Sequence, residues 1–235
     1  MGSPKVLLLS AVEEEMAPLH DRRKSLESFC APDFVVTGVG KVNAACESAL
    51  AFRSLAPVLS VQVGCAGAYP GALLSLGDVV ISDQEILGDE GVEAPTGFLD
   101  LSKLGFPLAT DGGLPIYNEI PTRRPRSESW KGLLCQIDGR YGLRSGPLVT
   151  LSTCSGTERR VLEIQARWNP LAESMEGAAT ALVALRHRCP FFEVRGISNQ
   201  AGERERSAWD IKTACEHAAE VAVHLISLEL ERNGK

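Results

Sequence analysis

Short apolar runs alternate along the chain with longer segments of helical periodicity, and this alternation limits the possible folds more than any other feature. Several of the short runs are apolar at almost every position, as in KVLLLSA near the start. Strands of this kind are buried on both faces, which is typical of a mainly parallel sheet covered by helices. The sequence therefore predicts an α/β fold, a three-layer sandwich around a central mixed, mainly parallel sheet, in a single domain over residues 1–235.

The same patterns place the individual elements. We expect strands over residues 5–11, 34–38, 58–67, 76–86, 146–156 and 190–199, and helices over residues 41–55, 157–168, 176–188 and 207–232. Residues 94–144 break the rhythm, because they carry several prolines, glycines and alternating charges. This segment is predicted to be a long excursion near the mouth of a site.

The charge balance excludes some classes of partner. Lys and Arg number 24 against 30 Asp and Glu, a formal net charge of −6, so there is no general basic field to attract nucleic acid or an anionic membrane. The first apolar run is also too short for a signal peptide or a membrane span. We expect the partners to be small molecules or further subunits.

The seven cysteines are odd in number, scattered, and never form a CxxC pair. This arrangement argues against a disulfide framework and against a zinc site, so no metal is expected and a reducing cytoplasm is the simplest location. The run TGVGKVNAA contains only part of a dinucleotide-binding fingerprint, because Asn43 stands where the third glycine would be. No nicotinamide cofactor, and no other cofactor, is expected.

Polar and glycine-rich segments follow the predicted strands. Ligands of open α/β sheets bind beyond the carboxyl ends of the strands, so a site is expected where these segments meet. The segments are EEE (residues 13–15), GVG (38–40), GCAGAY (64–69), STCSG (152–156), SMEG (174–177) and RGISN (195–199).

Each segment also has a structural interpretation. The three glutamates can simply complement a helix dipole, GCAGAY can be a tight turn, and Met175 with Glu176 can be a core residue beside a capping carboxylate. The four histidines have no ligand spacing and are interpreted as structural; they are His20, His187, His217 and His224.

Five motifs together resemble one family. AVEEEM, GVGKVNAA, GCAGAY, SMEGAA and VRGISNQAG occur in the order and approximate spacing of the nucleoside phosphorylase and nucleoside hydrolase superfamily, and the resemblance covers essentially the whole chain. The chain looks most like the branch that contains 5′-methylthioadenosine/S-adenosylhomocysteine nucleosidase and futalosine hydrolase. The stretch DEGVEAPTGFLDL, residues 89–101, is more similar to futalosine hydrolase. Members are usually dimers or larger, so the resemblance implies a homo-oligomer.

Cleavage of an N-ribosidic bond passes through a sugar with oxocarbenium character, so the site must hold the ribose, stabilise the departing base and deliver water. By resemblance, Glu176 accepts hydrogen bonds from the ribose hydroxyls and Met175 packs against the sugar. Glu15 and Arg195 hold and deprotonate the water in the same comparison. Glu14 is the alternative to Glu15 if the turn is shifted by one residue.

The resemblance also supplies the lining of the base site: Cys65, Ala66, Gly67, Ser198 and Asn199. Cys65 stands where the family has a small hydroxyl group near the water, and a thiol is a weaker hydrogen-bonding group. Ser198 is expected to orient Asn199.

The acidic cluster favours hydrolysis over phosphorolysis. A phosphorylase binds a phosphate dianion where the nucleophile sits, usually with arginines and backbone amides. Glu15 would repel that dianion, and the GVG turn is followed by a single Lys41 instead of an arginine-bearing loop.

Asn199 indicates the kind of base. In the adenosine-type nucleosidases the matching residue is an aspartic acid that protonates purine N7, and an asparagine cannot do this. Its amide can donate to both N7 and O6 of a 6-oxopurine, whose negative charge as a leaving group spreads onto O6. Asparagine also pairs with adenine, so hydrogen bonding alone does not decide. The missing acid, and an Asn at this place in 6-oxopurine-specific relatives, favour hypoxanthine.

Futalosine, a hypoxanthine nucleoside of menaquinone biosynthesis with an aromatic carboxylate on its 5′ side, fits these features. Its carboxylate needs a cation and its ring an apolar contact. The sequence offers Arg22, Arg23, Arg123, Arg124 and Arg126 for the first and Phe98 or Leu99 for the second. The alternatives are a methylthioadenosine/S-adenosylhomocysteine nucleosidase, a purine nucleoside phosphorylase and a nucleoside-binding protein without activity.

Overall fold

A mixed sheet lies at the centre of the structure, a computed structural model in which residues 2–123 and 127–231 are described. Neighbouring strands follow the order β11–β10–β4–β12–β3–β1–β2, and β9 pairs with β4. The pairs β4–β12, β3–β11 and β4–β9 are antiparallel and the other pairs are parallel, so the predicted mixed, mainly parallel sheet is confirmed. Its strands are β1 (Lys5–Ser10), β2 (Ala31–Val36), β3 (Leu59–Ala68), β4 (Val79–Leu87), β9 (Glu119–Pro121), β10 (Leu143–Thr150), β11 (Ala172–Ser174) and β12 (Phe191–Gln200).

One part of this sheet closes on itself. The short strand β11 pairs with β10 on one side and with β3 on the other, so that β3, β12, β4, β10 and β11 form a ring. The sequence patterns did not predict β11, because three residues are too few to show a period.

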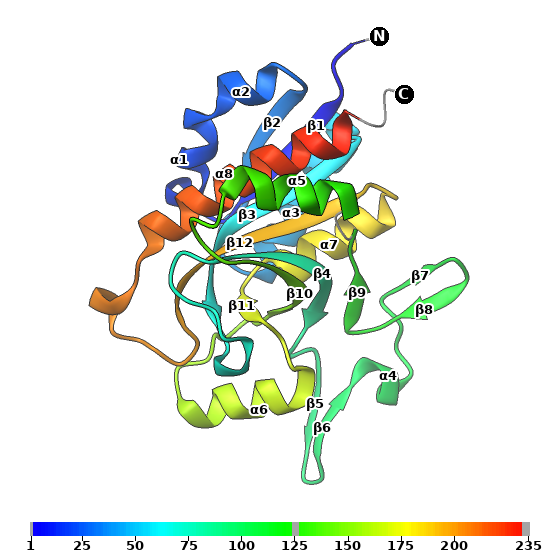
Figure 1. Cartoon of the computed structure of the whole chain (residues 1–235). Helices are drawn as coiled ribbons and strands as arrows, with labels where there is room; N and C mark the ends of the chain where they lie inside the picture. The colour runs from blue at the N-terminus through cyan, green and yellow to red at the C-terminus, as the bar shows by residue number, and fades with distance from the viewer. Residues whose placement is uncertain (1, 124–126, 232–235) are drawn as a thin grey trace.

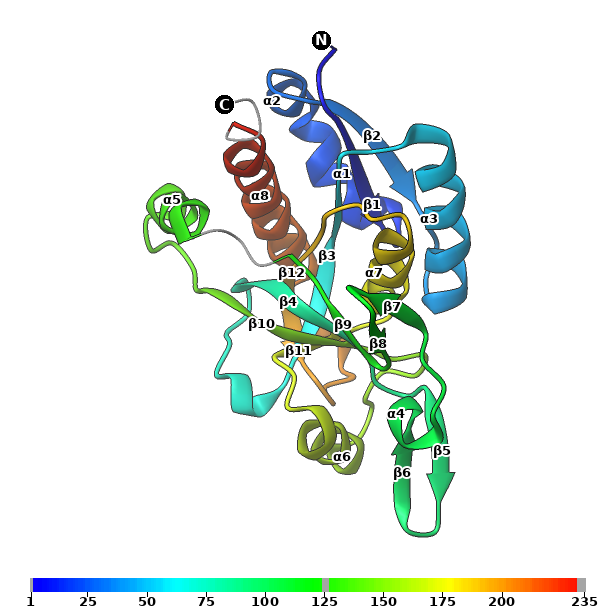
Figure 2. The same cartoon turned by 90° about the vertical axis from the view of Figure 1, so that its right-hand side faces the viewer.

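Helices cover both faces of the sheet (Figures 1 and 2). The helices α1, α2, α5 and α8 lie on one face, α3 and α7 lie on the other, and α6 lies beside the ring. Figure 2 shows the strands between α8 and α7. The helix bounds are α1 (Glu13–Asp21), α2 (Arg23–Glu27), α3 (Lys41–Leu55), α5 (Ser127–Ile137), α6 (Glu158–Trp168), α7 (Gly177–Arg186) and α8 (Ile211–Leu230).

Strand β1 shows why its sequence is continuously apolar. Val6 and Leu8 belong to the core beneath α1 and α8, whereas Leu7 and Leu9 belong to the core beneath α3 and α7. Successive side chains of a strand point to opposite faces, so a strand covered on both faces needs apolar residues at every position.

Small residues let the helices approach the central strands closely. A Cβ on Gly196 of β12 would lie 1.9 Å from the carbonyl oxygen of Ala214 in α8, so only glycine fits there. Ala178, Ala181 and Ala184 of α7 are buried against the rest of the chain. These contacts hold β12, which carries several of the predicted site residues, against its neighbours.

The described part of residues 94–144 is more regular than predicted. It contains short hairpins, a strand of the main sheet and α5, and its hairpins project at the lower right in Figure 1. Glycines with positive φ, such as Gly97 and Gly113, form tight turns between strands too short to show a period. The additional elements are β5 (Gly91–Ala94), β6 (Gly97–Asp100), α4 (Leu101–Leu104), β7 (Ala109–Asp111) and β8 (Leu114–Ile116), with 3₁₀ turns at Pro70–Ala72 and Arg206–Ala208 elsewhere.

No described helix is long and apolar enough to cross a membrane.

Candidate active site

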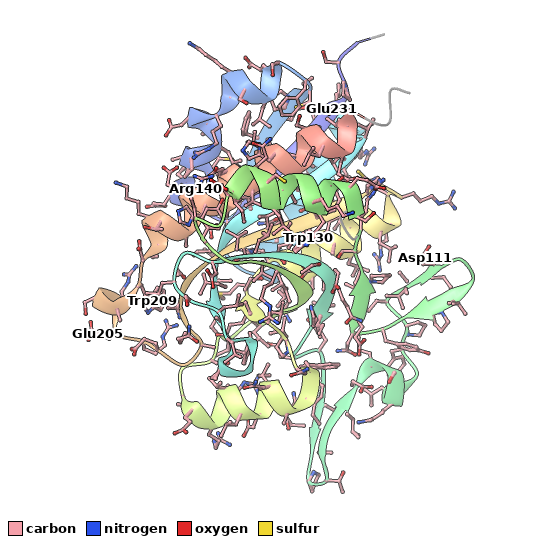
Figure 3. The ribbon with its side chains drawn as sticks, in the orientation of Figure 1. Asp111, Trp130, Arg140, Glu205, Trp209 and Glu231 are labelled. Carbon is pink, nitrogen blue, oxygen red and sulfur yellow. The ribbon has the colours of Figure 1, made fainter. Side chains whose placement is uncertain are left out.

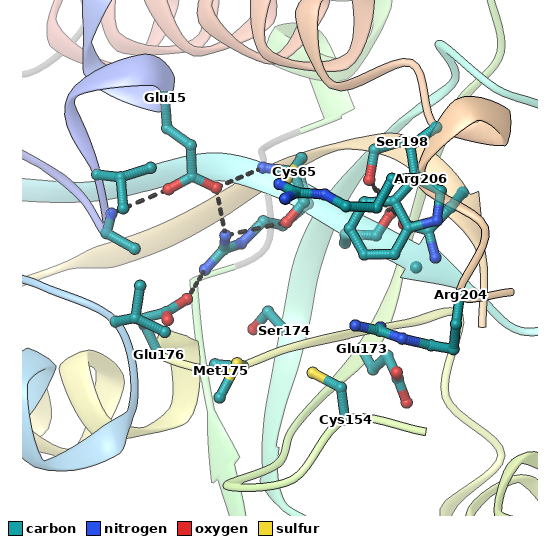
Figure 4. A pocket seen from close by; sticks show the side chains of 18 residues that line it. Glu15, Cys65, Cys154, Glu173, Ser174, Met175, Glu176, Ser198, Arg204 and Arg206 are labelled. Atoms are coloured by element: carbon teal, nitrogen blue, oxygen red, sulfur yellow. Dashed lines mark hydrogen bonds and ion pairs between the residues drawn. The ribbon is translucent and has the colours of Figure 1, made fainter. Parts of the chain in front are cut away.

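A cavity of about 360 Å³ lies at the carboxyl ends of β1, β3 and β12, where the sequence places the site (Figure 4). All the predicted site residues line it: Glu15, Cys65, Ala66, Gly67, Met175, Glu176, Arg195, Ser198 and Asn199. None of the described residues of the 94–144 segment, which was expected near the mouth of the site, lines it. The hairpins pair locally and project away from the sheet instead.

Glu15, Glu176 and Arg195 form what we call the inner end of the cavity, with Arg195 at its centre. The side chain of Arg195 is 1% exposed. One terminal nitrogen, Nη2, donates to Glu176 Oε2 at 3.1 Å, while Nη1 donates to Glu15 Oε1 at 3.4 Å and to the Cys65 carbonyl at 3.0 Å. Burial disfavours the charge of Arg195, but the surrounding carboxylates outweigh burial and raise its pKa well above the ordinary value.

Glu15 is fixed by the backbone around it. It lies in the first turn of α1, is 5% exposed, and accepts from the Ala11 amide at 3.0 Å and from the Cys65 amide at 2.9 Å. Glu14, the alternative left open by the sequence, is exposed and does not line the cavity. The carboxylate thus interacts favourably with the positive end of the α1 dipole and still faces the cavity.

Glu176 lies directly before α7 and faces the same space. Its Oε1 accepts from the Gly40 amide at 2.9 Å, which requires the positive φ of 93° that glycine adopts readily. Burial raises the pKa of Glu176, and the neighbouring Arg195 opposes that effect. Met175 lines the cavity beside it.

Two further buried carboxyl groups lie behind Arg195. Glu193 Oε1 accepts from Arg195 Nε at 2.5 Å, and both Glu193 and Glu85 are fully buried. Burial, followed by the charge of Glu193, raises the pKa of Glu85 well above its ordinary value. The sequence patterns gave no reason to select these two residues, since each reads as an interior position of a strand.

The amide of Asn199 has a defined orientation. Ser198 Oγ donates to Asn199 Oδ1 at 2.8 Å, and Asn199 Nδ2 donates to the Gln200 carbonyl at 2.9 Å. Because the oxygen accepts from Ser198, the NH₂ group is the part of this amide that retains a donor for a ligand.

Cys65 contributes its backbone. Its N–H donates to Glu15 and its carbonyl accepts from Arg195, so both contacts to the inner end are independent of the side chain. The replacement of a hydroxyl group by a thiol at this position therefore leaves them intact.

A third carboxylate, Glu173, which was not selected from the sequence, also faces the cavity. Glu173 Oε2 accepts from Tyr69 Oη at 2.6 Å and from Ser155 Oγ at 2.7 Å, and Oε1 accepts from the Ser155 amide at 2.9 Å. Cys154 lies beside it, and burial raises the pKa of that thiol to about 12. The motifs STCSG and GCAGAY pointed to this region, but Glu173 precedes SMEG by one residue and was passed over.

Residues 201–210, between β12 and α8, form a rim loop that no sequence motif marked. Arg204, Arg206 and Trp209 of this loop line the cavity. Figure 3 shows Glu205 and Trp209 in the loop, at the edge of the molecule. Two arginines five and seven residues after the end of RGISN were the available signal.

The cations proposed from the sequence lie elsewhere. Arg22 pairs with Glu216 at 3.0 Å, Arg23 lies over the ring of Phe34, and Arg123 reaches Glu229 at 3.7 Å. None of the three lines the cavity, and Arg124 and Arg126 fall outside the described residues.

The apolar candidates also lie away from the cavity. Phe98 packs against Trp168, with its ring covered by Arg167, and Leu99 lies in the β5–β6 hairpin. Across residues 2–123 and 127–231, no group of three or more His, Cys, Asp or Glu side chains is arranged to hold a metal ion.

Comparisons with known proteins agree with this architecture. The Phosphorylase superfamily matches residues 34–228. A futalosine hydrolase of Thermus thermophilus is 33% identical over 197 residues, which cover 83% of this chain and 81% of that protein. A 5′-methylthioadenosine/S-adenosylhomocysteine nucleosidase of Geobacillus thermodenitrificans is 26% identical over 95% of this chain and 97% of its own length.

Among solved structures, the corresponding nucleosidase of Neisseria meningitidis, in complex with methylthio-immucillin-A, superposes with a TM-score of 0.78. It is 23% identical and covers 95% of this chain and 99% of its own. At that identity the likeness shows the shared fold.

Proposed function

The chain belongs to the phosphorylase superfamily, and from that membership and the geometry of the cavity we propose that it hydrolyses the N-glycosidic bond of a purine nucleoside, with futalosine as its substrate. The observation that carries the proposal is the inner end of the cavity, where Arg195 bridges the carboxylates of Glu15 and Glu176. The futalosine hydrolases among its relatives support the substrate.

The ribose is held by Glu176 in this proposal. Its carboxylate keeps acceptor capacity beyond the bonds from Gly40 and Arg195, and two vicinal hydroxyls can donate to it. Met175 contributes an apolar contact to the sugar face.

Water is the nucleophile, and Glu15 is its general base. The water adds to the anomeric carbon of the ribose as the bond to the purine nitrogen breaks, and its proton passes to Glu15. Arg195 orients the water through Nη2, which has a second hydrogen beyond the one donated to Glu176 Oε2. The purine leaves with the bonding electron pair and is later protonated by solvent.

Asn199 selects a base that can leave without prior protonation. Its NH₂ group, directed by Ser198, donates one hydrogen to the Gln200 carbonyl and the other to the N7/O6 edge of hypoxanthine, where the negative charge develops. Adenine would need an acid at this place, and the amide is not one.

The charges around the nucleophile favour water over phosphate. Lys41, the cation after the GVG turn, is paired with Asp89 at 2.5 Å and with Glu90 at 2.8 Å. The Gly40 amide is donated to Glu176, and Arg195 is surrounded by Glu15, Glu176 and Glu193. A phosphate dianion would meet two carboxylates there, Glu15 and Glu176, without an uncommitted cation at the inner end.

The proposal includes self-association. Val42, Cys46 and Leu50 lie one turn apart on α3, all three are exposed, and Val42 is 84% exposed. Val39, which lines the cavity, continues this apolar strip, so a second copy on α3 would also border the site. Light scattering should give the mass of a dimer or larger oligomer, and Val42→Asp should lower it. A monomer at micromolar concentration would contradict this part.

A chromatographic assay tests the function. The purified protein is incubated with futalosine, inosine, methylthioadenosine and S-adenosylhomocysteine, with and without phosphate. We expect hypoxanthine from futalosine without phosphate, and much slower release of adenine. Adenine as the dominant product would favour the methylthioadenosine/S-adenosylhomocysteine nucleosidase, for which the relatives of that name provide support. A strict phosphate requirement would indicate a phosphorylase, and no product at all a binding protein.

A further inference from the structure

We propose that Arg204, Arg206 and Trp209 of the rim loop form a subsite for an anionic aromatic group, an aryl carboxylate, at the end of the nucleoside remote from the reacting bond. This inference rests on the proposed function and assigns the residues that would distinguish the substrate from a simple nucleoside.

The two arginines are free to bind a ligand. Within the described part of the chain, neither guanidinium forms an ion pair or donates a hydrogen bond to another residue. The neighbouring carboxylates are used by the loop itself. Glu203 Oε1 accepts from the Glu205 amide at 2.6 Å, and Glu205 Oε1 accepts from the Ser207 amide at 3.3 Å.

The rim loop is anchored to the site at both ends. The Asp210 amide donates to the Ser198 carbonyl at 2.9 Å, and the Gly202 amide donates to the Ser155 carbonyl at 3.2 Å. Ser198 and Ser155 belong to the networks of Asn199 and Glu173, so the loop is held beside residues that line the cavity. The arginines are exposed, but their attachment points are fixed.

The charge distribution across the cavity gives a direction to a bound ligand. Figure 4 shows Glu15 and Glu176 on one side of the pocket, while the side chains of Arg204 and Arg206 reach in from the other. An anionic substituent is repelled by the carboxylates at the inner end and attracted at the rim, where two arginines lie beside a single cavity-lining carboxylate, Glu173. The uncharged ribose is left at the acidic side, where the reaction is proposed to occur.

Trp209 adds a planar surface to this cationic rim. The Arg204 guanidinium lies 4.9 Å from the centroid of the indole ring, and Trp209 Nε1 donates to the Glu203 carbonyl at 3.2 Å, which fixes the ring. A planar guanidinium matches a carboxylate through paired hydrogen bonds, and the indole offers an aromatic ring a face or edge to pack on. A phosphate would use the arginines alone, so the tryptophan favours an aryl carboxylate.

The test compares substrates that share the base and ribose. Values of kcat/KM are measured for futalosine, inosine and inosine 5′-monophosphate with the wild type, the double variant Arg204→Gln/Arg206→Gln, and Trp209→Leu. The matched control is Arg159→Gln, since Arg159 is an arginine on α6 that is 84% exposed and does not line the cavity.

In the double variant, the ratio of kcat/KM for futalosine to that for inosine should fall about 100-fold, because hydrogen bonds to charged groups are lost. Trp209→Leu should lower the ratio by a smaller factor, and Arg159→Gln should preserve it. An unchanged ratio in the double variant would overturn the inference. A loss confined to inosine 5′-monophosphate would assign the arginines to a phosphate instead.

A failure of the proposed function would be visible separately. If the wild type releases no base from any nucleoside, the hydrolase proposal falls, and calorimetric titration of futalosine onto the same proteins still tests the subsite. Affinity at least 10-fold weaker in the double variant than in the wild type and in Arg159→Gln would support it. Equal affinity would contradict it.

Discussion

The inner end of the cavity is made of buried side chains held by strand ends and helix starts, whereas the rim loop presents exposed arginines to the same space. Every nitrogen of the Arg195 guanidinium has a partner before any ligand arrives, while Arg204 and Arg206 form no ion pair with a described residue. Preorganised groups suit the reacting atoms, which need fixed geometry, and uncommitted charges suit recognition of a substituent. The inner end is therefore suited to the reaction itself, and the rim loop to recognition of the substrate, within one cavity.

Removal of the proposed general base, Glu15, tests the role of the inner end and should have the strongest effect. Glu15→Gln should lower kcat about 1,000-fold, because proton transfer from water is lost while the side chain keeps its shape. The measurement is hypoxanthine release under saturating futalosine, with thermal unfolding as a check on folding. The matched control is Glu14→Gln, since Glu14 is exposed and lies outside the cavity. A larger loss of kcat in Glu14→Gln than in Glu15→Gln would show that Glu15 is not the general base.

The next test concerns the support of Arg195. Glu193→Gln should reduce kcat about 10- to 100-fold with little change in KM, because the neutral amide holds the Nε of Arg195 less firmly. Glu193→Asp keeps the charge on a shorter side chain and should recover part of the activity. A rise in KM with kcat unchanged would show that Glu193 serves ground-state binding instead of positioning the arginine.

Asn199 also lines the cavity, and its substitution tests how the base is selected. Asn199→Asp should shift the ratio of adenine release to hypoxanthine release at least about 10-fold toward adenine, because the carboxyl group can protonate a leaving adenine. Matched nucleosides that differ only in the base, adenosine and inosine, provide the readout. A ratio equal to that of the wild type would remove Asn199 from base selection.

The smallest expected effect is on stability. Because the pKa of Glu85 is raised in the folded state, the folded chain holds a proton that the unfolded chain releases above its ordinary carboxyl pKa. Wild-type stability from this group is therefore fully present below that pKa and is lost as the pH rises toward the folded-state pKa. A glutamine at this position does not titrate, so the stability of Glu85→Gln does not fall with rising pH for this reason.

The melting temperature of Glu85→Gln minus that of the wild type should therefore become more positive by a few degrees between acidic and mildly alkaline pH, at about 2–4 °C for each kcal/mol. Differential scanning fluorimetry at several pH values measures it. A difference that stays constant with pH would mean that Glu85 is ionised in the folded chain.

The sequence predicted the sheet, its main strands and the helices α3, α6, α7 and α8, because long buried strands and amphipathic helices have clear periods. The bounds of α1, α2 and α5 were not predicted. The helix over residues 41–55 was predicted with the bounds that α3 has. Short elements were missed, since strands of three or four residues such as β11 and β7 depend on tertiary pairing instead of local pattern.

The site residues that lie in sequence motifs were predicted, and those outside the motifs were not. The motif residues meet in one cavity because they follow strands whose carboxyl ends are adjacent. Glu85 and Glu193 were missed because a buried carboxyl group inside a strand has no local signature. The rim arginines were missed because their importance depends on Glu203 and Glu205 bonding to the loop backbone, which only the folded loop reveals.

Attack of water on the ribose at the inner end of the cavity can be tested with labelled solvent. Futalosine is incubated with the protein in phosphate-free water enriched in oxygen-18, and the ribosyl product is analysed by mass spectrometry. We expect hypoxanthine together with a ribosyl product that carries one heavy oxygen from the solvent. Base release that requires phosphate and yields an unlabelled sugar phosphate would contradict it.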